Sequence, residues 1–197
     1  MQLGELCDIY SGYTARGRLE PITAGGVPAI QLRDVRPHGD VADGSLQRYD
    51  LADLSDRYLV RGGEVIFKSR GAPNTAAVVS AALTEPAAVI VPLIIMRPDQ
   101  THVLPAYLAW AINQPDAQRK LGSEAQGTSL RMIPKGVLER LDIPLPDLET
   151  QHRIATVDAL AQREGGLLRE LADRREQFNS LILGERAKLA QLQGYPQ

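Results

Sequence analysis

The feature that most constrains the fold is a long apolar repeat near the C-terminus. Between residues 157 and 192, positions spaced alternately four and three residues apart read Val157, Ala161, Glu164, Leu168, Leu171, Arg175, Phe178, Ile182, Glu185, Leu189 and Leu192. This spacing places the side chains on one face of a helix, as at the a and d positions of a coiled coil. At about 1.5 Å per residue, a helix over residues 149–192 would be roughly 65 Å long, and one small domain cannot cover that length.

We therefore expect part of this face to pack against a helix of another chain. The apolar residues expected at the dimer interface are Val157, Leu168, Leu171, Phe178, Ile182, Leu189 and Leu192. The alternative is a helix that folds back against its own domain.

The composition fits one ordinary soluble domain followed by this helix. The 197 residues are 44% hydrophobic and 23% charged, which is typical of a globular chain. The apolar run Ala87–Met96 is about half as long as a membrane span and is interrupted by Pro92,. The first residues lack the basic start and apolar core of a signal peptide. We expect a cytoplasmic protein with no membrane partner.

The junction between domain and helix is encoded by prolines and a capping residue. A short apolar strand is predicted over Leu141–Leu145 and is stopped by Pro144 and Pro146. Asp147 then has the position of a helix N-cap, and Glu149 lies in the first turn, where a carboxylate opposes the helix dipole. We predict a domain over residues 1–147 and a helical arm over residues 148–193.

The first domain is predicted to mix strands and helices. Periodicity and turn signals indicate strands at 29–32, 46–49, 64–68 and 75–80, with Ala87–Met96 as one fully buried central strand. Helices are predicted over 104–113 and 116–122, with one helical turn between Leu51 and Tyr58. The expected fold class is α+β, a mixed-sheet domain followed by a long C-terminal coiled-coil helix.

Polar residues that can contact nucleic acid fall at strand ends and in loops. The net charge is −2, which argues mildly against such a partner when averaged over the surface, but Lys and Arg residues are clustered. Gln31 and Arg33 alternate with Ile30 and Leu32, and their side chains can read adenine and guanine edges. The full candidate set is Ser11, Tyr13, Thr14, Arg16, Gln31, Arg33, Lys68, Arg70, Asn74, Thr128, Ser129, Arg131 and Lys135. Ordinary solvated surface is the alternative for each, and a small-anion site is the alternative for the loop of Lys68, Arg70 and Asn74.

Motifs for catalysis are missing from the sequence. There is no P-loop, dinucleotide-binding glycine pattern, nucleophile elbow or methyltransferase signature. Cys7 is the only cysteine, and the three histidines are scattered, so neither a disulfide nor a Cys-based metal site is expected. We predict a protein that is not an enzyme and that needs no cofactor or metal.

Several motifs resemble one known family when they are taken in order. They include Gly127-Thr128-Ser129, Ile133, Ile143-Pro144-Leu145-Pro146, Leu148 and Gln151-His152-Arg153-Ile154. This run resembles the end of a target-recognition domain in the specificity (S) subunit of type I restriction–modification systems. The segments Gly26–Val35, Glu64–Gly71 and Leu104–Asn113 are similar to further parts of that domain.

The resemblance implies a sequence-specific DNA-recognition subunit without chemistry of its own. A standard S subunit carries two recognition domains and two helical arms, whereas this sequence has one of each. The family pattern therefore implies a homodimer, paired antiparallel through the arm, with one DNA half-site per copy. The implied partners are double-stranded DNA and DNA methyltransferase (modification) subunits, with or without a restriction nuclease/translocase subunit. The alternative is an adaptor or inhibitor that binds methyltransferase subunits through the same fold without reading DNA.

Overall fold

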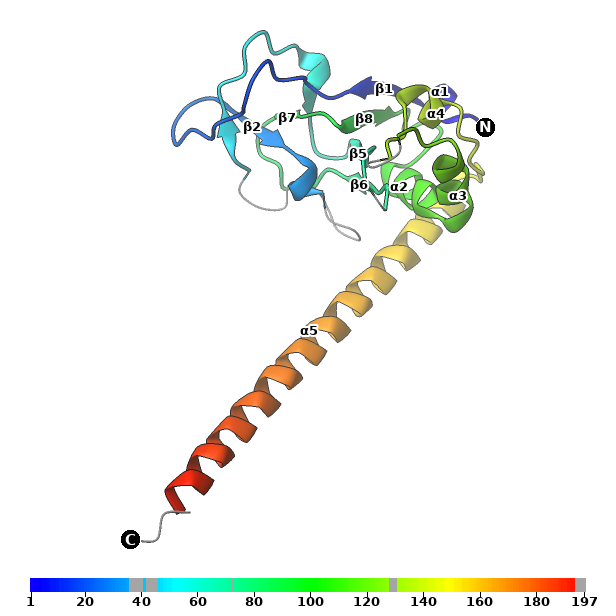
Figure 1. Cartoon of the computed structure of the whole chain (residues 1–197). Helices are drawn as coiled ribbons and strands as arrows, with labels where there is room; N and C mark the ends of the chain where they lie inside the picture. The colour runs from blue at the N-terminus through cyan, green and yellow to red at the C-terminus, as the bar shows by residue number, and fades with distance from the viewer. Residues whose placement is uncertain (36–40, 42–45, 72, 128–130, 194–197) are drawn as a thin grey trace. The chain divides into compact units, whose positions relative to one another are not determined.

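The computed structural model divides the chain into two compact units, Met1–Thr156 and Val157–Gln197 (Figure 1). It describes residues 1–35, 41, 46–71, 73–127 and 131–193, with side chains as far as residue 189. The first unit holds two β-sheets and several helices, and the second consists of most of the long final helix. The predicted α+β class is therefore confirmed.

The first sheet is antiparallel, with strand order β1-β8-β5-β6. Its strands are β1 (Cys7–Ser11), β5 (Val65–Lys68), β6 (Ala76–Val78) and β8 (Leu93–Pro98). Side chains alternate across this sheet: Phe67 and Met96 join a core with the helices, whereas Ile66 and Ile95 join a core on the opposite face. Because both faces are covered, β5 and β8 are apolar without polar alternation.

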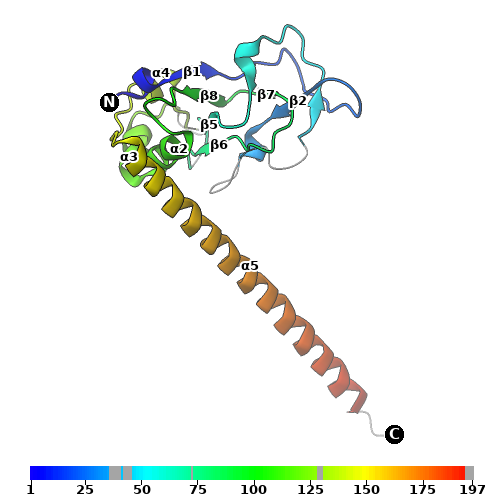
Figure 2. The same cartoon turned by 180° about the vertical axis from the view of Figure 1, so that it is seen from behind.

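The second sheet is mixed, with strand order β3-β2-β7-β4. It comprises β2 (Val27–Ile30), β3 (Arg48–Tyr49), β4 (Leu59–Val60) and β7 (Ala87–Val89). β2 and β7 are parallel, and the remaining pairs are antiparallel. Short 3-10 helices η1 (Leu32–Asp34) and η2 (Asp56–Tyr58) flank β2 and β4. The sheet lies at the opposite end of the first unit from the α-helices of that unit (Figure 2).

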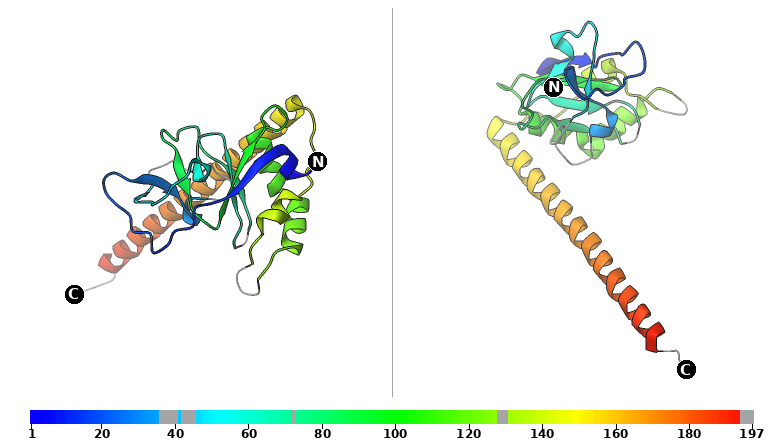
Figure 3. Two further views of the ribbon diagram at one scale, coloured as in Figure 1. Left: turned by 90° about the horizontal axis from the view of Figure 1, so that it is seen from above. Right: turned by 90° about the vertical axis from the view of Figure 1, so that its left-hand side faces the viewer.

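Helices α1 (Leu3–Leu6), α2 (Pro105–Asn113), α3 (Pro115–Ser123) and α4 (Lys135–Glu139) complete the first unit (Figure 3). The helix predicted over 104–113 is confirmed, with Pro105 in its first turn, where a missing N–H costs nothing,. Tyr107 is buried, and Trp110 packs beside it with ring centroids 5.3 Å apart. Both aromatic residues are thus part of the core.

The prediction of one strand over Ala87–Met96 is wrong. This segment forms β7 and β8, which belong to different sheets and are separated by residues 90–92. Pro92 lacks a backbone N–H, so it cannot donate to a ladder and lies where pairing changes from one sheet to the other. Because both strands are buried, the apolar pattern of the sequence does not show that this segment divides into two strands.

The strand predicted over Leu141–Leu145 is also wrong. The segment is extended, but in the described part of the chain it forms only a bridge between Gln2 and Asp142. Its backbone pairs with the N-terminus through Leu3 N–H to Leu141 O, at 3.0 Å. Pro144 and Pro146 have no N–H groups to extend this ladder.

The final helix, α5, runs without interruption from Leu148 to Gln193. Asp147 is its N-cap, because Asp147 Oδ1 accepts the Thr150 N–H at 2.7 Å, as predicted. Gln151 in the first turns is completely buried, so the start of α5 belongs to the first unit. No helix among the described residues is both long and apolar enough to cross a membrane.

Candidate nucleic-acid interface

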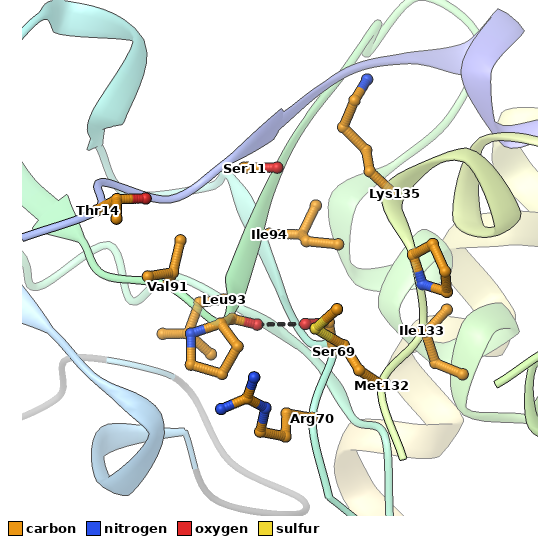
Figure 4. Close-up of a pocket in the computed structure, with 12 residues that line it drawn as sticks. Ser11, Thr14, Ser69, Arg70, Val91, Leu93, Ile94, Met132, Ile133 and Lys135 are labelled. Carbon is orange, nitrogen blue, oxygen red and sulfur yellow. Dashed lines mark hydrogen bonds between the residues drawn. The ribbon is translucent and has the colours of Figure 1, made fainter. Parts of the chain in front are cut away.

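One hollow of about 390 Å³ opens where β1, the loop after β5 and the segment before α4 meet. Predicted site residues Ser11, Thr14, Arg70 and Lys135 line it. Figure 4 shows Thr14 and Val91 on one side, Ile133 and Lys135 on the other, and Arg70 below. Three segments far apart in the sequence therefore place polar side chains around one depression.

A second hollow of about 620 Å³ adjoins the first, because both are lined by Thr14, Val91 and Pro92. Predicted residues Gln31 and Arg33 line this second hollow. We refer to the two hollows together as the basic hollow. It combines the end of the first sheet with the end of the second.

The charge of the basic hollow differs from that of the whole chain. Its described lining residues include four cations, Arg18, Arg33, Arg70 and Lys135, and no Asp or Glu. The chain as a whole has a net charge of −2. Arg33 and Lys135 form ion pairs with Asp34 and Glu139, which do not line the hollow. The cations of the lining attract polyanions even when the average surface is weakly acidic.

Arg33 is held in place by a small polar network. Its Nη2 donates to Tyr49 Oη at 2.9 Å and to Gln47 Oε1, and Tyr49 Oη donates to the same Gln47 oxygen at 2.7 Å. Tyr49 is buried, so its hydroxyl is a fixed anchor. The network orients the guanidinium in advance, which lowers the entropy lost when it binds a ligand.

Backbone contacts hold the loops that form the rim. Ile133 N–H donates to Ser69 O at 2.8 Å, and Gly71 N–H donates to Arg131 O at 3.2 Å. Ser69 Oγ also donates to Pro92 O (Figure 4). The floor of the hollow is therefore tied to the loop that carries Arg70.

Gly12 allows the loop after β1 to lie against the residues between β7 and β8. Its N–H donates to Leu93 O at 2.9 Å, and a Cβ added to it would lie 2.7 Å from Val89 O. No side chain larger than hydrogen fits that distance without moving backbone. The glycine between Ser11 and Tyr13 is thus a requirement of close packing.

Three predicted site residues make contacts within the protein. Tyr13 Oη donates to Ala52 O at 2.8 Å, and its ring packs edge-on against Tyr58. Asn74 Nδ2 donates to Lys68 O at 3.1 Å. Arg131 Nη2 donates to Gly122 O at 2.8 Å, next to the end of α3. These contacts assign the three side chains a part in holding the loops.

Of the other predicted residues, Lys135 lines the hollow, Arg16 and Lys68 lie beside it, and Thr128 and Ser129 are outside the described residues. Arg16 is exposed and forms an ion pair with Asp53 at 3.4 Å. Lys68 ends β5 and is half-buried, and it does not line either hollow. Lys135 donates to Ile9 O at 3.3 Å and forms an ion pair with Glu139. Thr128 and Ser129 lie outside the described residues.

Sequence reasoning did not include Gln47, Tyr49 and Arg18 among the site residues. Gln47 and Tyr49 are two residues apart next to and on β3, so a strand places them on one face,. This alternation is the sequence signal from which the pairing of Gln47 and Tyr49 in the Arg33 network could have been predicted. Arg18 belongs to a basic cluster in the sequence, but nothing local indicates that it faces the second sheet.

The single cysteine is not a reactive group. Burial raises the pKa of Cys7 to about 12, and the Asp8 and Glu139 carboxylates add to the effect. Its Sγ donates to Leu3 O at 3.1 Å. Because the thiolate is the nucleophilic form, Cys7 cannot act as a nucleophile near neutral pH. No group of three or more His, Cys, Asp or Glu that could hold a metal ion occurs among the described residues.

Comparison with known proteins identifies related folds. Residues 1–160 match the family model described as Type I restriction modification DNA specificity domain. The HsdS subunit from Thermoanaerobacter tengcongensis has a TM-score of 0.61 and 23% identity, covering 85% of this chain and 38% of that chain. A chain from a study of complex assembly and conformational transition of the type I R-M system has a TM-score of 0.66 and 21% identity, covering 91% and 42%.

A third similar structure is the type I restriction–modification system S subunit from M. genitalium. Its TM-score is 0.53 with 16% identity, covering 95% of this chain and 42% of that chain. At these identities the structural likeness concerns the fold. The chain spans about two fifths of the length of each of the three structures. No curated protein matches the sequence.

Proposed function

The chain belongs to the family of type I restriction modification DNA specificity domains, and from this premise we propose that it is a sequence-specific DNA-recognition subunit. The observation that carries the proposal is the basic hollow, with four cations and no carboxylate among its described lining residues. DNA phosphates bind cations, whereas base edges are read by Arg and Gln side chains. Arg33 and Gln31 are the readers we propose, and Arg70 is a third candidate.

We propose that the protein itself performs no chemistry. Its partners in this proposal are double-stranded DNA and methyltransferase subunits, and a nuclease subunit can join them. The supporting observations are the non-reactive Cys7 and the hollow without carboxylates, which offer neither a thiolate nucleophile nor a metal-binding pair of acids,. The functional division that we propose is a DNA-reading domain over residues 1–147 and an arm over residues 148–193.

We further propose that two copies act together, each reading one half-site. The supporting observation is that α5 exposes a row of apolar side chains. Pairing of two copies through α5 would bury this row and supply two DNA-reading domains. We call the face formed by the alternating positions 157–192 the seam. Its exposed apolar residues are Val157, Leu168, Leu171, Phe178, Ile182 and Leu189. The side chain of Leu192 lies outside the described residues.

Binding to a randomised duplex library, with and without a methyltransferase subunit, tests this proposal. The expected result is enrichment of one sequence. Arg33→Ala should relax the preference at one position, because a bidentate base contact is worth about 1–3 kcal/mol. Arg70→Ala should do the same if Arg70 reads a base. If it holds a phosphate, affinity should fall uniformly and the slope of log K against log salt should drop by about 1.

Arg61→Ala is the matched control. Arg61 is exposed, lies in the same unit and does not line the hollow, so the substitution removes one charge without touching the proposed site. Equal binding by wild type, Arg33→Ala and Arg70→Ala would contradict the site. Methyltransferase binding without any DNA preference would favour an adaptor or inhibitor instead.

A further inference from the structure

We propose that α5 pairs with α5 of a second copy in one antiparallel register, fixed by two reciprocal ion pairs between Glu164 and Arg175. The two-fold axis passes between Arg169 and Glu170. This inference rests on the proposed pairing of two copies and adds its geometry. It is carried by the apolar seam together with the positions of the charges that interrupt it.

The seam is a continuous surface in need of a partner. α5 is helical from Leu148 to Gln193, so positions four and three apart stay on one face. Its large apolar members between Val157 and Leu189 are 44–66% exposed. Glu164, Arg175 and Glu185 lie on the same face. A partner helix must therefore accept both the apolar side chains and three charges.

Parallel pairing in register does not meet this condition. It would place Glu164 against Glu164, Arg175 against Arg175 and Glu185 against Glu185. Like charges that face each other within an interface are strongly unfavourable. Antiparallel pairing instead opposes an a position with a d position, so unlike charges can meet.

Several antiparallel registers place the seam of one copy against the seam of the other. Only two of them place a negatively charged seam residue opposite a positively charged one. With the axis between Arg169 and Glu170, Glu164 opposes Arg175. With the axis at Ser180, Arg175 opposes Glu185. An axis at Asp173, or between Glu176 and Gln177, places the charged residues against Leu, Ile, Phe or Ala. Burying an unpaired charge is costly, so those registers are disfavoured.

Three observations favour the axis between Arg169 and Glu170. In this register Glu185 falls opposite Ile154 and keeps its ion pair with Lys188. The uncharged layers between residues 157 and 182 pair Val157 with Ile182, Ala161 with Phe178, and Leu168 with Leu171. Each of these layers is apolar, and the small Ala161 faces the largest side chain of the seam. Complementary volumes of this kind let facing layers interdigitate.

The second observation concerns the apolar side chains that flank the seam. With an axis at Ser180 the residues of α5 before 167, Leu160 among them, have no partner. Their apolar surface then stays in water, whereas its burial would contribute about 25 cal/mol per Å². Leu160 of one copy also flanks Leu181 of the other, and both are more than 60% exposed in the single chain.

The third observation concerns the charges within a single chain. Glu185 forms an ion pair with Lys188 at 3.5 Å. Among the described residues, neither Glu164 nor Arg175 forms an ion pair, although the neighbouring Glu170 and Arg174 pair with each other at 2.6 Å. Glu164 and Arg175 are thus the seam charges that a second copy would neutralise.

Charge exchange in the full-length chain tests the register. Glu164→Arg alone and Arg175→Glu alone each place like charges in two layers, and each should weaken self-association about 100-fold. An equimolar mixture of the two variants should associate nearly as well as wild type, because both layers of the mixed dimer hold unlike charges. The double variant Glu164→Arg/Arg175→Glu should also recover. Sedimentation at several concentrations measures each case.

The control is the corresponding exchange for the other register. If the axis lies at Ser180, Arg175→Glu is rescued by Glu185→Arg, and Glu164→Arg alone leaves self-association unchanged. That result would overturn the register while leaving the pairing of two copies in place. A wild-type chain that stays monomeric would contradict the pairing itself, whether or not the chain binds DNA.

A distance measurement gives a second criterion that does not depend on variant affinity. A spin label at Arg163→Cys in each copy should lie about 20 Å from its mate along the axis in the proposed register, and about 50 Å away with the axis at Ser180, at ~1.5 Å per residue. Cys7 remains unlabelled because burial suppresses its thiolate,. A distance near 50 Å would overturn the proposal.

Discussion

Gln151 is a polar residue with 0% exposure in the first turns of α5. Its Oε1 accepts the Leu104 N–H at 2.9 Å, and its Nε2 donates to His102 O at 2.9 Å and to Pro146 O at 2.8 Å. One amide therefore satisfies the backbone just before α2 and just before α5. We predict that Gln151→Leu, which removes these hydrogen bonds at similar volume, destabilises the first unit.

The magnitude follows from the three bonds lost. A buried polar group left without a partner costs about 1–3 kcal/mol. The Leu104 N–H has a single hydrogen to donate, whereas carbonyl groups tolerate the loss of a partner better. We expect a cost near the lower end of this range for each of the three groups, about 3 kcal/mol in total. For a chain of this size, such a change lowers Tm by roughly 6–12 °C.

The assay should report on the first unit alone. Trp110 is the only tryptophan, and it packs against the core through Tyr107, so its fluorescence follows unfolding of that unit and not of the arm. Gln177→Leu is the control, because Gln177 is exposed on the same helix. If Gln151→Leu and Gln177→Leu unfold at the same denaturant concentration as wild type, the proposed anchoring by Gln151 is refuted.

Other predictions concern the loops and the helix start. Gly12→Ala should destabilise the first unit by about 1–3 kcal/mol, because its Cβ would lie 2.7 Å from Val89 O,; denaturation measures this. Cys7 should resist alkylation at pH 8 until the protein unfolds, since burial raises its pKa to about 12,; rapid labelling of folded protein would contradict this. The hydrogen bonds from Thr150 hold the pKa of Asp147 below its usual value. The Asp147 carboxylate therefore stabilises the folded state fully at pH values above its pKa in the unfolded chain. This stabilisation is lost as the pH falls through the lower pKa of the folded state. The difference in stability between wild type and Asp147→Ala should therefore shrink in acid.

The sequence predicts most accurately where a single period governs the structure. The alternating spacing over residues 157–192 identifies α5, and Asp147 identifies its start, because both signals are local. The strand around Val65–Lys68 and the helix around Tyr107 are readable for the same reason. Local patterns and end signals are sufficient for these elements.

Prediction is weaker where the structure depends on contacts distant in the sequence. The apolar pattern of Ala87–Met96 predicts one buried strand because β7 and β8 are both covered. Composition gives no information on which sheet each of the two strands joins. Gln47 and Tyr49 orient Arg33 only after β3 pairs with β2. Gln151 is readable as a motif residue, but its three partners become evident only when α2 lies next to the start of α5.

The basic hollow illustrates the same limit. Ser11, Arg70 and Lys135 come from three segments, and each is also compatible with ordinary solvated surface. Their convergence on one depression is a property of the folded unit. Arg131 lies in the same region, yet it donates to the backbone near the end of α3. Residue type alone does not separate these two roles.

The most direct test of DNA recognition is to co-purify the chain with a methyltransferase subunit and to map the methylated positions on DNA. Wild type should direct methylation to one sequence, and Arg33→Ala should broaden that sequence at a defined position, whereas Arg61→Ala should leave it unchanged. Methylation at the same positions without the chain, or an identical pattern with Arg33→Ala and Arg70→Ala, would contradict the proposal that the basic hollow selects the DNA site.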